Sequence, residues 1–235
     1  MKSNTIVIFT GGEAPVRKTV ECIAENAFTD SVFIAADSGA AAAEQYDIIP
    51  DILIGDMDSI GSEKAYISKA AEVKKFPQDK DYTDTELALL EADKYEYEKI
   101  ILIGGNGGRL DHLLALRSLY ERNKSGIPYP DIWFCGNNAV FCLDKDRKYS
   151  LCIRNLHGKG CISFFPLFGE QGEPIIHSKG LMWDISSLNW RQCGGSVSNR
   201  AGKTENGVQD VELSVLSGRF LVIIPLSDES VFKVL

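Results

Sequence analysis

The sequence has 235 residues, of which 44% are hydrophobic and 25% are charged, and this balance is that of a globular chain and excludes intrinsic disorder. The net charge of −8 comes from the first 140 residues, which carry 14 basic and 23 acidic side chains, so we expect no nucleic-acid partner. No apolar run approaches the roughly 18 residues that a membrane span needs, so we expect a cytoplasmic protein without a membrane partner.

Short β-type runs alternate with helical stretches as far as about residue 136. The runs predicted to be strands are 5–9, 31–36, 51–54, 73–76, 99–103 and 131–134. The stretches predicted to be helices are 15–27, 38–46, 62–71, 83–95 and 111–124. Thr83 and Glu86 have the spacing of a capping box, which marks the start of the fourth helix. This alternation predicts an α/β fold with a mostly parallel, Rossmann-like sheet flanked by helices.

The pattern changes after about residue 145. Hydrophobic and polar residues alternate over 149–153 and 211–215, and a turn at 217–218 separates the second of these runs from a further one. Glycine and proline recur throughout, and we find no amphipathic helix. We therefore predict two domains: an α/β domain over residues 1–145, and an all-β sandwich over residues 146–235.

The six cysteines stand singly at apolar positions, without a CxxC pair or a nearby histidine at zinc-ligand spacing. We expect them to be reduced core residues. They are Cys22, Cys135, Cys142, Cys152, Cys161 and Cys193.

Aspartates are concentrated between residues 37 and 84, a stretch that holds eight of the 17 in the chain. Asp37 follows the second predicted strand, and Asp56 and Asp58 follow the third. Residues 79–84 follow the fourth strand, and the glycine-rich loop 104–108 follows the fifth. Because the carboxyl ends of parallel strands open on the same edge of a sheet, we expect these loops to converge on one site.

Crowded carboxylates repel one another, and a divalent cation relieves the repulsion. Mg²⁺ takes one or two carboxylates together with water and phosphate oxygens, so the cluster predicts Mg²⁺ and a phosphorylated ligand. Lys80 and Arg109 can balance phosphate charge, and the glycine-rich loop before Arg109 lets the backbone approach an anion. Phosphoryl or nucleotidyl transfer is the reaction class that these residues favour, with a metal-dependent phosphohydrolase as a more distant alternative.

Several of these residues also have a purely structural explanation. Asp37 can cap the helix that follows it, and Asp111 can simply favour the positive end of its helix. The Asp56 and Asp58 pair is common by chance and also occurs in phosphatases and metal-dependent glycosyl transferases. The three histidines are isolated, and the glycine pair at 11–12 lacks the remainder of a P-loop.

Six segments carry a resemblance to a known family: AADSGA at 35–40, PDILIGDMDSI at 50–60, FPQDKDYTDTELAL at 76–89, GGRLDH at 107–112, and more weakly GLMW at 180–183 and GGSVSN at 194–199. In this order and at these spacings they resemble the thiamine pyrophosphokinases. The resemblance implies that residues 1–145 form a catalytic domain that binds ATP and Mg²⁺, and that the β-sandwich of residues 146–235 binds thiamine. It also implies a homodimer, and transfer of the diphosphate of ATP to the hydroxyethyl group of thiamine, with release of AMP.

The resemblance further implies roles for individual residues. Those expected in catalysis are Asp81, Asp84, Arg109 and Asp111, with Asp81 or Asp84 as the base. Those expected to bind the nucleotide are Asp37, Lys80, Thr83 and Arg109, and those expected to hold Mg²⁺ are Asp56, Asp58 and Asp84. Those expected to bind thiamine are Trp183, Ser196, Ser198 and Asn199. For Trp183, packing inside the sandwich is the alternative.

Three positions depart from the family pattern. Met57 replaces the usual Phe, Asp79 stands where Glu is typical, and Arg200 stands where an acidic residue is common. Two other functions stay open at this point. One is diphosphate transfer to another primary alcohol such as a hydroxymethylpterin, and the other is a non-catalytic sensor of thiamine or nucleotide.

Overall fold

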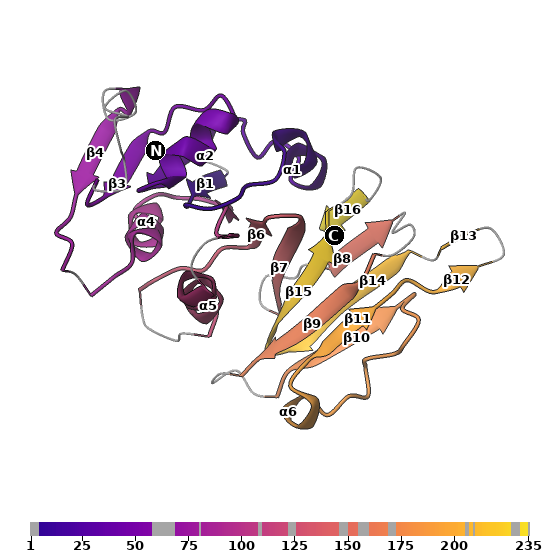
Figure 1. Ribbon diagram of the computed structural model, residues 1–235. Helices are drawn as coiled ribbons and strands as arrows, with labels where there is room; N and C mark the ends of the chain where they lie inside the picture. The colour runs from indigo at the N-terminus through magenta and orange to yellow at the C-terminus, as the bar shows by residue number, and fades with distance from the viewer. Residues whose placement is uncertain are drawn as a thin grey trace. The chain divides into compact units, whose positions relative to one another are not determined.

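The computed structural model describes residues 5–57, 69–79, 81–107, 110–121, 126–145, 150–154, 160–168, 173–204, 207–208, 210–226 and 231–234. The chain separates into two compact units, Met1–Gly136 and Asn137–Leu235. In Figure 1 the first unit runs from indigo through magenta, and the second continues through orange to yellow.

The first unit is a parallel sheet with helices beside it, which confirms the predicted fold class. Its strands are β1 (Thr5–Phe9), β2 (Ser31–Ala36), β3 (Ile52–Gly55), β4 (Glu72–Lys75), β5 (Lys99–Ile103) and β6 (Ile132–Cys135). Its helices are α1 (Arg17–Ile23), α2 (Gly39–Gln45), α4 (Asp84–Ala92) and α5 (Leu110–Leu119). The strands pair in parallel in the order β6-β5-β1-β2-β3-β4.

The central strands are apolar on both faces because both faces are covered. Every residue of β1 and β3 is buried, and α2 and α4 both pack against β1 and β2. The start of α2 lies very near β1: a Cβ on Gly39 would be 2.1 Å from the carbonyl oxygen of Phe9. Only glycine therefore allows this helix to begin directly beside the strand end.

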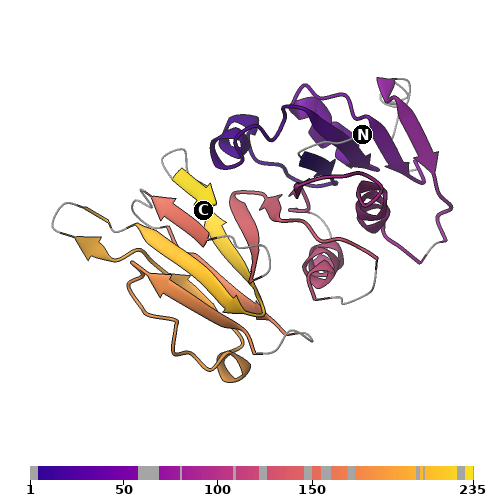
Figure 2. The same ribbon diagram turned by 180° about the vertical axis from the view of Figure 1, so that it is seen from behind.

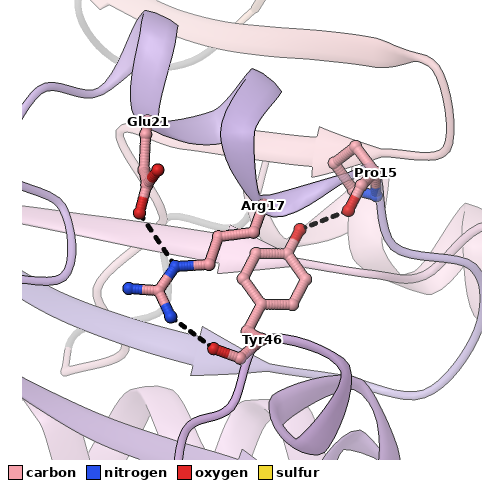
Figure 3. A network of polar contacts seen from close by, with 4 residues as sticks. All are labelled: Pro15, Arg17, Glu21 and Tyr46. Carbon is pink, nitrogen blue, oxygen red and sulfur yellow. Dashed lines mark hydrogen bonds and ion pairs between the residues drawn. The ribbon is translucent and has the colours of Figure 1, made fainter.

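A buried tyrosine ties the chain before α1 to the end of α2 (Figure 3). The Tyr46 hydroxyl donates to the carbonyl oxygen of Pro15 at 2.6 Å, and the Tyr46 carbonyl accepts from Nη1 of Arg17 at 2.5 Å. Nε of Arg17 also donates to Glu21 at 2.8 Å. Burial raises the pKa of Tyr46 well above its usual value, against a smaller lowering by Arg17. The phenol therefore stays protonated and keeps its donated hydrogen bond.

The second unit consists of antiparallel sheets, whose orange and yellow strands can be followed from behind in Figure 2. Its elements are β7 (Asn138–Asp144), β8 (Ser150–Arg154), β9 (Ile162–Leu167), β10 (Ile175–Lys179), α6 (Trp190–Cys193), β11 (Ser196–Asn199), β12 (Lys203–Thr204), β13 (Gly207–Val208), β14 (Val211–Ser217), β15 (Arg219–Pro225) and β16 (Val231–Val234). The strands β11, β9, β15 and β7 are hydrogen-bonded neighbours in that order, and we call them the first set of strands. The strands β10, β14, β8 and β16 form a second set, also paired in the order given, and β12 pairs with β13. β14 packs against β7, so the two larger sets face each other.

Several boundaries and elements differ from the sequence-based expectations. The units meet between Gly136 and Asn137 instead of near residue 145, because β7 pairs with β15 of the second unit. A short helix, α6, is present where we expected none. Helix α1 covers only Arg17–Ile23 of the predicted 15–27, and the left-handed φ of 60° at Asn26 is incompatible with helix at that position.

The predicted helix at 62–71 lies almost entirely outside the described residues. Within the described parts of the chain, no helix is long and apolar enough to cross a membrane.

The cysteines do not all lie in the core. Cys142 is buried, and its burial raises the pKa of the thiol to about 12. Cys22 and Cys193 are exposed, so the expectation of a core position is wrong for these two. Their helices, α1 and α6, are short and turn those positions outward.

Candidate functional site

A cavity of about 630 Å³ lies at the carboxyl edge of the parallel sheet in the first unit. It is lined by residues that directly follow β1, β2, β3 and β5, and by the first turn of α4 and one side of α5. Its volume is within the range of about 300–1,000 Å³ that is typical of small-molecule sites.

The structure brings five of the expected site residues together around this cavity. They are Asp37, Asp56, Asp81, Thr83 and Asp84. Asp111 is exposed in the first turn of α5 and is not among the described residues that line the cavity. Asp58, Lys80 and Arg109 lie outside the described residues.

Backbone geometry fixes the aspartates at the strand ends. The N–H of Asp37 donates to the carbonyl oxygen of Ile54 at 2.7 Å, and Asp37 has a left-handed φ of 46°. Aspartate tolerates this conformation better than most residues do. Met57 also has a positive φ, 65°, directly after Asp56. Both turns occur where the chain leaves the sheet edge, so local strain accompanies the carboxylates.

Two glycine-rich loops lie against each other beside the carboxylates. The N–H of Gly105 donates to the carbonyl oxygen of Gly11 at 2.7 Å, and the N–H of Glu13 donates to that of Asn106 at 2.6 Å. A Cβ on Gly12, whose φ is 100°, would be 2.4 Å from the Asn106 oxygen. The loop after β1 was not a predicted part of the site, although the rule used for the other strand ends also applies to β1.

The capping box of α4 is confirmed. The side chain of Thr83 accepts from the N–H of Glu86 at 3.2 Å, and the N–H of Thr83 donates to the Glu86 carboxylate at 2.8 Å. Beside it, the hydroxyl groups of Thr10 and Thr85 lie 2.8 Å apart, both buried. These contacts fix the start of α4 at the cavity, where the positive end of a helix favours an anion.

Helix α5 gives the cavity an apolar wall. Ala115, Leu116 and Leu119 line it, and His112 lies one turn nearer the helix start. His112 is isolated in the sequence, so its position there does not indicate a place at the cavity. The cavity therefore combines carboxylates and backbone N–H groups with an apolar surface, as a ligand with both a charged and a flat apolar part requires.

The carboxylates fit a magnesium ion that shares its ligands with a phosphate group. Among the described residues, no three His, Cys, Asp or Glu side chains are close enough together to hold a metal ion on their own. Mg²⁺ needs only one or two carboxylates when water and phosphate complete its shell. Asp56 and Asp84 both line the cavity, so each is a candidate ligand of this kind.

The second unit holds the four residues expected to bind thiamine. Trp183 is 55% exposed, so it does not pack inside the sandwich. Ser196 and Ser198 lie on β11, and Ser198 is exposed with a left-handed φ of 63°. Asn199 is buried, and its side-chain amide bonds to the backbone of Trp183.

The chain is also similar to known proteins. Residues 25–129 match the family model described as the thiamin pyrophosphokinase catalytic domain. Thiamine pyrophosphokinase of Bacillus subtilis is 36% identical over 43% of this chain and 49% of its own length, so the match spans about half of that relative. Thiamin pyrophosphokinase 1 of Caenorhabditis elegans is 33% identical over 70% of this chain and 69% of its own length.

The fold has known counterparts as well. A crystal structure of a thiamin pyrophosphokinase family protein from Enterococcus faecalis matches with a TM-score of 0.67 and 20% identity, over 96% of this chain and all of the other. At that identity the match supports the fold alone. The C. elegans relative is similar over more than two thirds of its length, and its likeness takes in both units. This chain therefore belongs to the thiamine pyrophosphokinase family.

Proposed function

We propose that this protein is a thiamine diphosphokinase, which transfers the diphosphate group of ATP to the hydroxyethyl group of thiamine and releases AMP. One observation carries the proposal: in a chain of this family, four aspartates from the segments that follow β2, β3 and β4 line one cavity at the carboxyl edge of the sheet. Positioning and charge neutralisation are the main needs of phosphoryl transfer, and such a cavity supplies both.

The first unit would hold the nucleotide and the metal. Asp56, Asp84 and Asp58 would hold Mg²⁺, which would screen the phosphate oxygens of ATP. Asp37 and Thr83 would position the nucleotide together with Lys80 and Arg109. The apolar wall on α5 offers a surface for the base. The second unit would hold thiamine, with Trp183, Ser196 and Ser198 as its candidate contacts.

The reaction would be an in-line displacement at the β-phosphorus. The hydroxyl oxygen of thiamine forms a bond to that phosphorus, and the bond from phosphorus to the oxygen bridging to the α-phosphate breaks. Asp81 or Asp84 accepts the hydroxyl proton, and AMP leaves with the bridging oxygen. Arg109 would stabilise the charge that develops on the phosphate, and Asp111 would help to orient the hydroxyl group.

An AMP-release assay tests the proposal. Purified protein with ATP and Mg²⁺ should release AMP only when thiamine is present, and mass spectrometry should identify thiamine diphosphate. AMP or phosphate release without thiamine would instead indicate hydrolysis. Release that depends on hydroxymethylpterin would indicate another acceptor, and tight binding without turnover would indicate a sensor.

We also propose that the protein works in the cytoplasm as a homodimer, as its family resemblance implies. Light scattering at the assay concentration checks the dimer. A monomer that turns over at full rate would contradict it.

A further inference from the structure

The side chain of Asn199 is buried, at 2% exposure, and its hydrogen bonds go to backbone groups. Its Oδ1 accepts from the N–H of Trp183 at 3.3 Å and from the N–H of Arg200 at 2.8 Å. Its Nδ2 donates to the carbonyl oxygen of Trp183 at 2.8 Å. Because the oxygen meets two N–H groups and the nitrogen meets a carbonyl, these partners fix the orientation of the amide.

The amide extends a short antiparallel pairing between two segments of the second unit. The N–H of Met182 donates to the carbonyl oxygen of Arg200, and the N–H of Gly202 donates to that of Gly180, both at 2.7 Å. The Asn199 side chain continues this pairing at Trp183. It bonds both the N–H and the carbonyl oxygen of Trp183, as the backbone of a neighbouring strand would do. The backbone of Trp183 is therefore held on both of its polar groups.

The indole of Trp183 is exposed although its backbone is fixed. Trp183 is 55% exposed to solvent, whereas Trp133 and Trp190 are each 5% exposed. Because the backbone of Trp183 is already fixed, only the side-chain torsions of the indole remain to be ordered when its flat face binds a ligand. Such a face suits a planar or cationic ring. Thiamine, the acceptor in the proposed function, has a planar pyrimidine and a cationic thiazolium.

We propose that Asn199 is a positioning residue, which holds the backbone of Trp183 so that its indole is ready to bind thiamine. It acts through Trp183 and does not contact the substrate itself. This inference rests on the proposed function for the identity of the ring that the indole binds. The hydrogen bonds that carry it do not depend on that function.

The first test compares Asn199→Ala with Asn189→Ala. Asn189 also bonds a backbone group through its side chain, the N–H of Gln192 at 3.2 Å, but it caps α6 and does not bond Trp183. We expect Asn199→Ala to raise the KM for thiamine about tenfold and to leave the KM for ATP within about twofold. We expect Asn189→Ala to change neither constant. Equal effects of the two variants on the thiamine KM would overturn the proposal.

A second test places both changes in one chain. If Asn199 acts through Trp183, adding Asn199→Ala to Trp183→Ala should raise the thiamine KM no further. A further rise of about tenfold would overturn the proposal, because Asn199 would then contact thiamine directly. If Asn199→Ala fails to fold, Asn199→Asp serves instead, since it keeps both accepted bonds and turns the donated one into a repulsive contact between a carboxylate oxygen and the carbonyl oxygen of Trp183.

A third measurement does not depend on turnover. Acrylamide quenches exposed indoles, and Trp183 is by far the most exposed of the three tryptophans. We expect Asn199→Asp to change this quenching, while Asn189→Ala leaves it as in the wild type. Unchanged quenching in the Asn199 variants would overturn the proposal. A wild-type protein that makes no thiamine diphosphate, with quenching altered as expected, would overturn the proposed function and leave the positioning role of Asn199 in place.

Discussion

The hydroxyl groups of Thr10 and Thr85 form a buried contact of 2.8 Å beside the cavity. Thr10 follows β1, and Thr85 is the second residue of α4, so the contact fixes the first turn of that helix to the edge of the sheet. Asp84 precedes Thr85 directly and lines the same cavity. The position of this carboxylate therefore depends on a hydroxyl group 74 residues away in the chain.

Replacing Thr10 with valine should reduce both stability and turnover. The change keeps the side-chain shape but leaves the Thr85 hydroxyl without this partner, which costs about 1–2 kcal/mol of unfolding free energy. We expect kcat to fall about tenfold because Asp84 is no longer held in place. Thr10→Ser keeps the hydroxyl and should retain most of the activity. Urea unfolding and steady-state kinetics measure the two effects, and equal kcat values for the two variants would contradict the argument.

Asp84 and Asp93 offer a matched pair at the two ends of α4. Asp84→Asn removes a carboxylate from the cavity and should lower kcat at least about 100-fold, with the fold unchanged by circular dichroism. Asp93 is exposed at the C-cap, where a negative charge faces the negative end of the helix. Asp93→Asn should therefore keep full activity and unfold at the same or a slightly higher temperature. Comparable losses in both variants would mean that the carboxylate of Asp84 has no special role.

Among individual residues, the sequence predicted the carboxylates that line the cavity. It did not predict the side chains that hold the site residues in place. Asp37, Asp56, Asp81 and Asp84 could be found because each follows a recognisable strand or precedes a recognisable helix. Thr10 could not be found, since its partner is chosen by tertiary packing and threonine is common in strands. Asn199 was predicted as a ligand of thiamine, and only the structure shows that its amide bonds the Trp183 backbone.

Between elements, an ion pair joins α4 to β4. The carboxylate of Glu91 lies 2.8 Å from Nζ of Lys74 on β4 and 2.8 Å from Nζ of Lys94. Glu91 as a whole is only 5% exposed to solvent. Burial acts to raise the pKa of Glu91, but the hydrogen bonds and charges of the two lysines outweigh it and lower the pKa below the usual value. The charged form is therefore favoured in the folded state.

This lowered pKa predicts a dependence of stability on pH. Because Glu91 binds its proton less readily when folded, its contribution is present above its unfolded pKa of about 4.3 and is lost as the pH falls through the lower folded value. Glu91→Gln should cost about 1–3 kcal/mol at pH 7 and much less at pH 3. Urea titrations at the two pH values measure this difference. A cost that does not depend on pH would contradict the assignment.

The elements themselves were predicted with different success. The bounds of β1, β2 and β5 match the predicted strands residue for residue, since buried parallel strands are apolar without interruption. The alternation in 211–215 predicted a strand but not its partners. β14 and β15 follow each other directly and yet belong to different sets of strands. Alternation shows which side chains face inward, and it does not show which strand lies alongside.

At the scale of the whole molecule, the chain combines a parallel unit that bears the cavity with an antiparallel unit that bears Trp183. The predicted boundary lies nine residues after the observed one, because the charged segment 143–148 resembles a linker. In the structure, β7 begins at Asn138 and extends to Asp144, so part of that segment is strand. Pairing with β15, far along the chain, decides that β7 belongs to the second unit. Composition alone does not contain that information.

Ligand binding to the first unit should stabilise the protein in a way that requires a divalent cation. A non-hydrolysable ATP analogue at about 100 times its Kd, with Mg²⁺, should add about 2.7 kcal/mol to the unfolding free energy and raise the melting temperature. EDTA should remove most of the rise, and so should Asp56→Asn. Differential scanning calorimetry measures the shift. The same rise in the presence of EDTA would contradict a metal role for these carboxylates.

The place of β15 in the second unit has a consequence for how the protein is made. β15 (Arg219–Pro225) pairs with both β7 and β9, which come much earlier in the chain. On the ribosome, β7 and β9 emerge with edges that stay unpaired until Pro225 has been added, whereas the strands of the first unit are all complete by Cys135. We therefore expect chains that are released early, between residues 168 and 218, to carry exposed strand edges and to aggregate during synthesis.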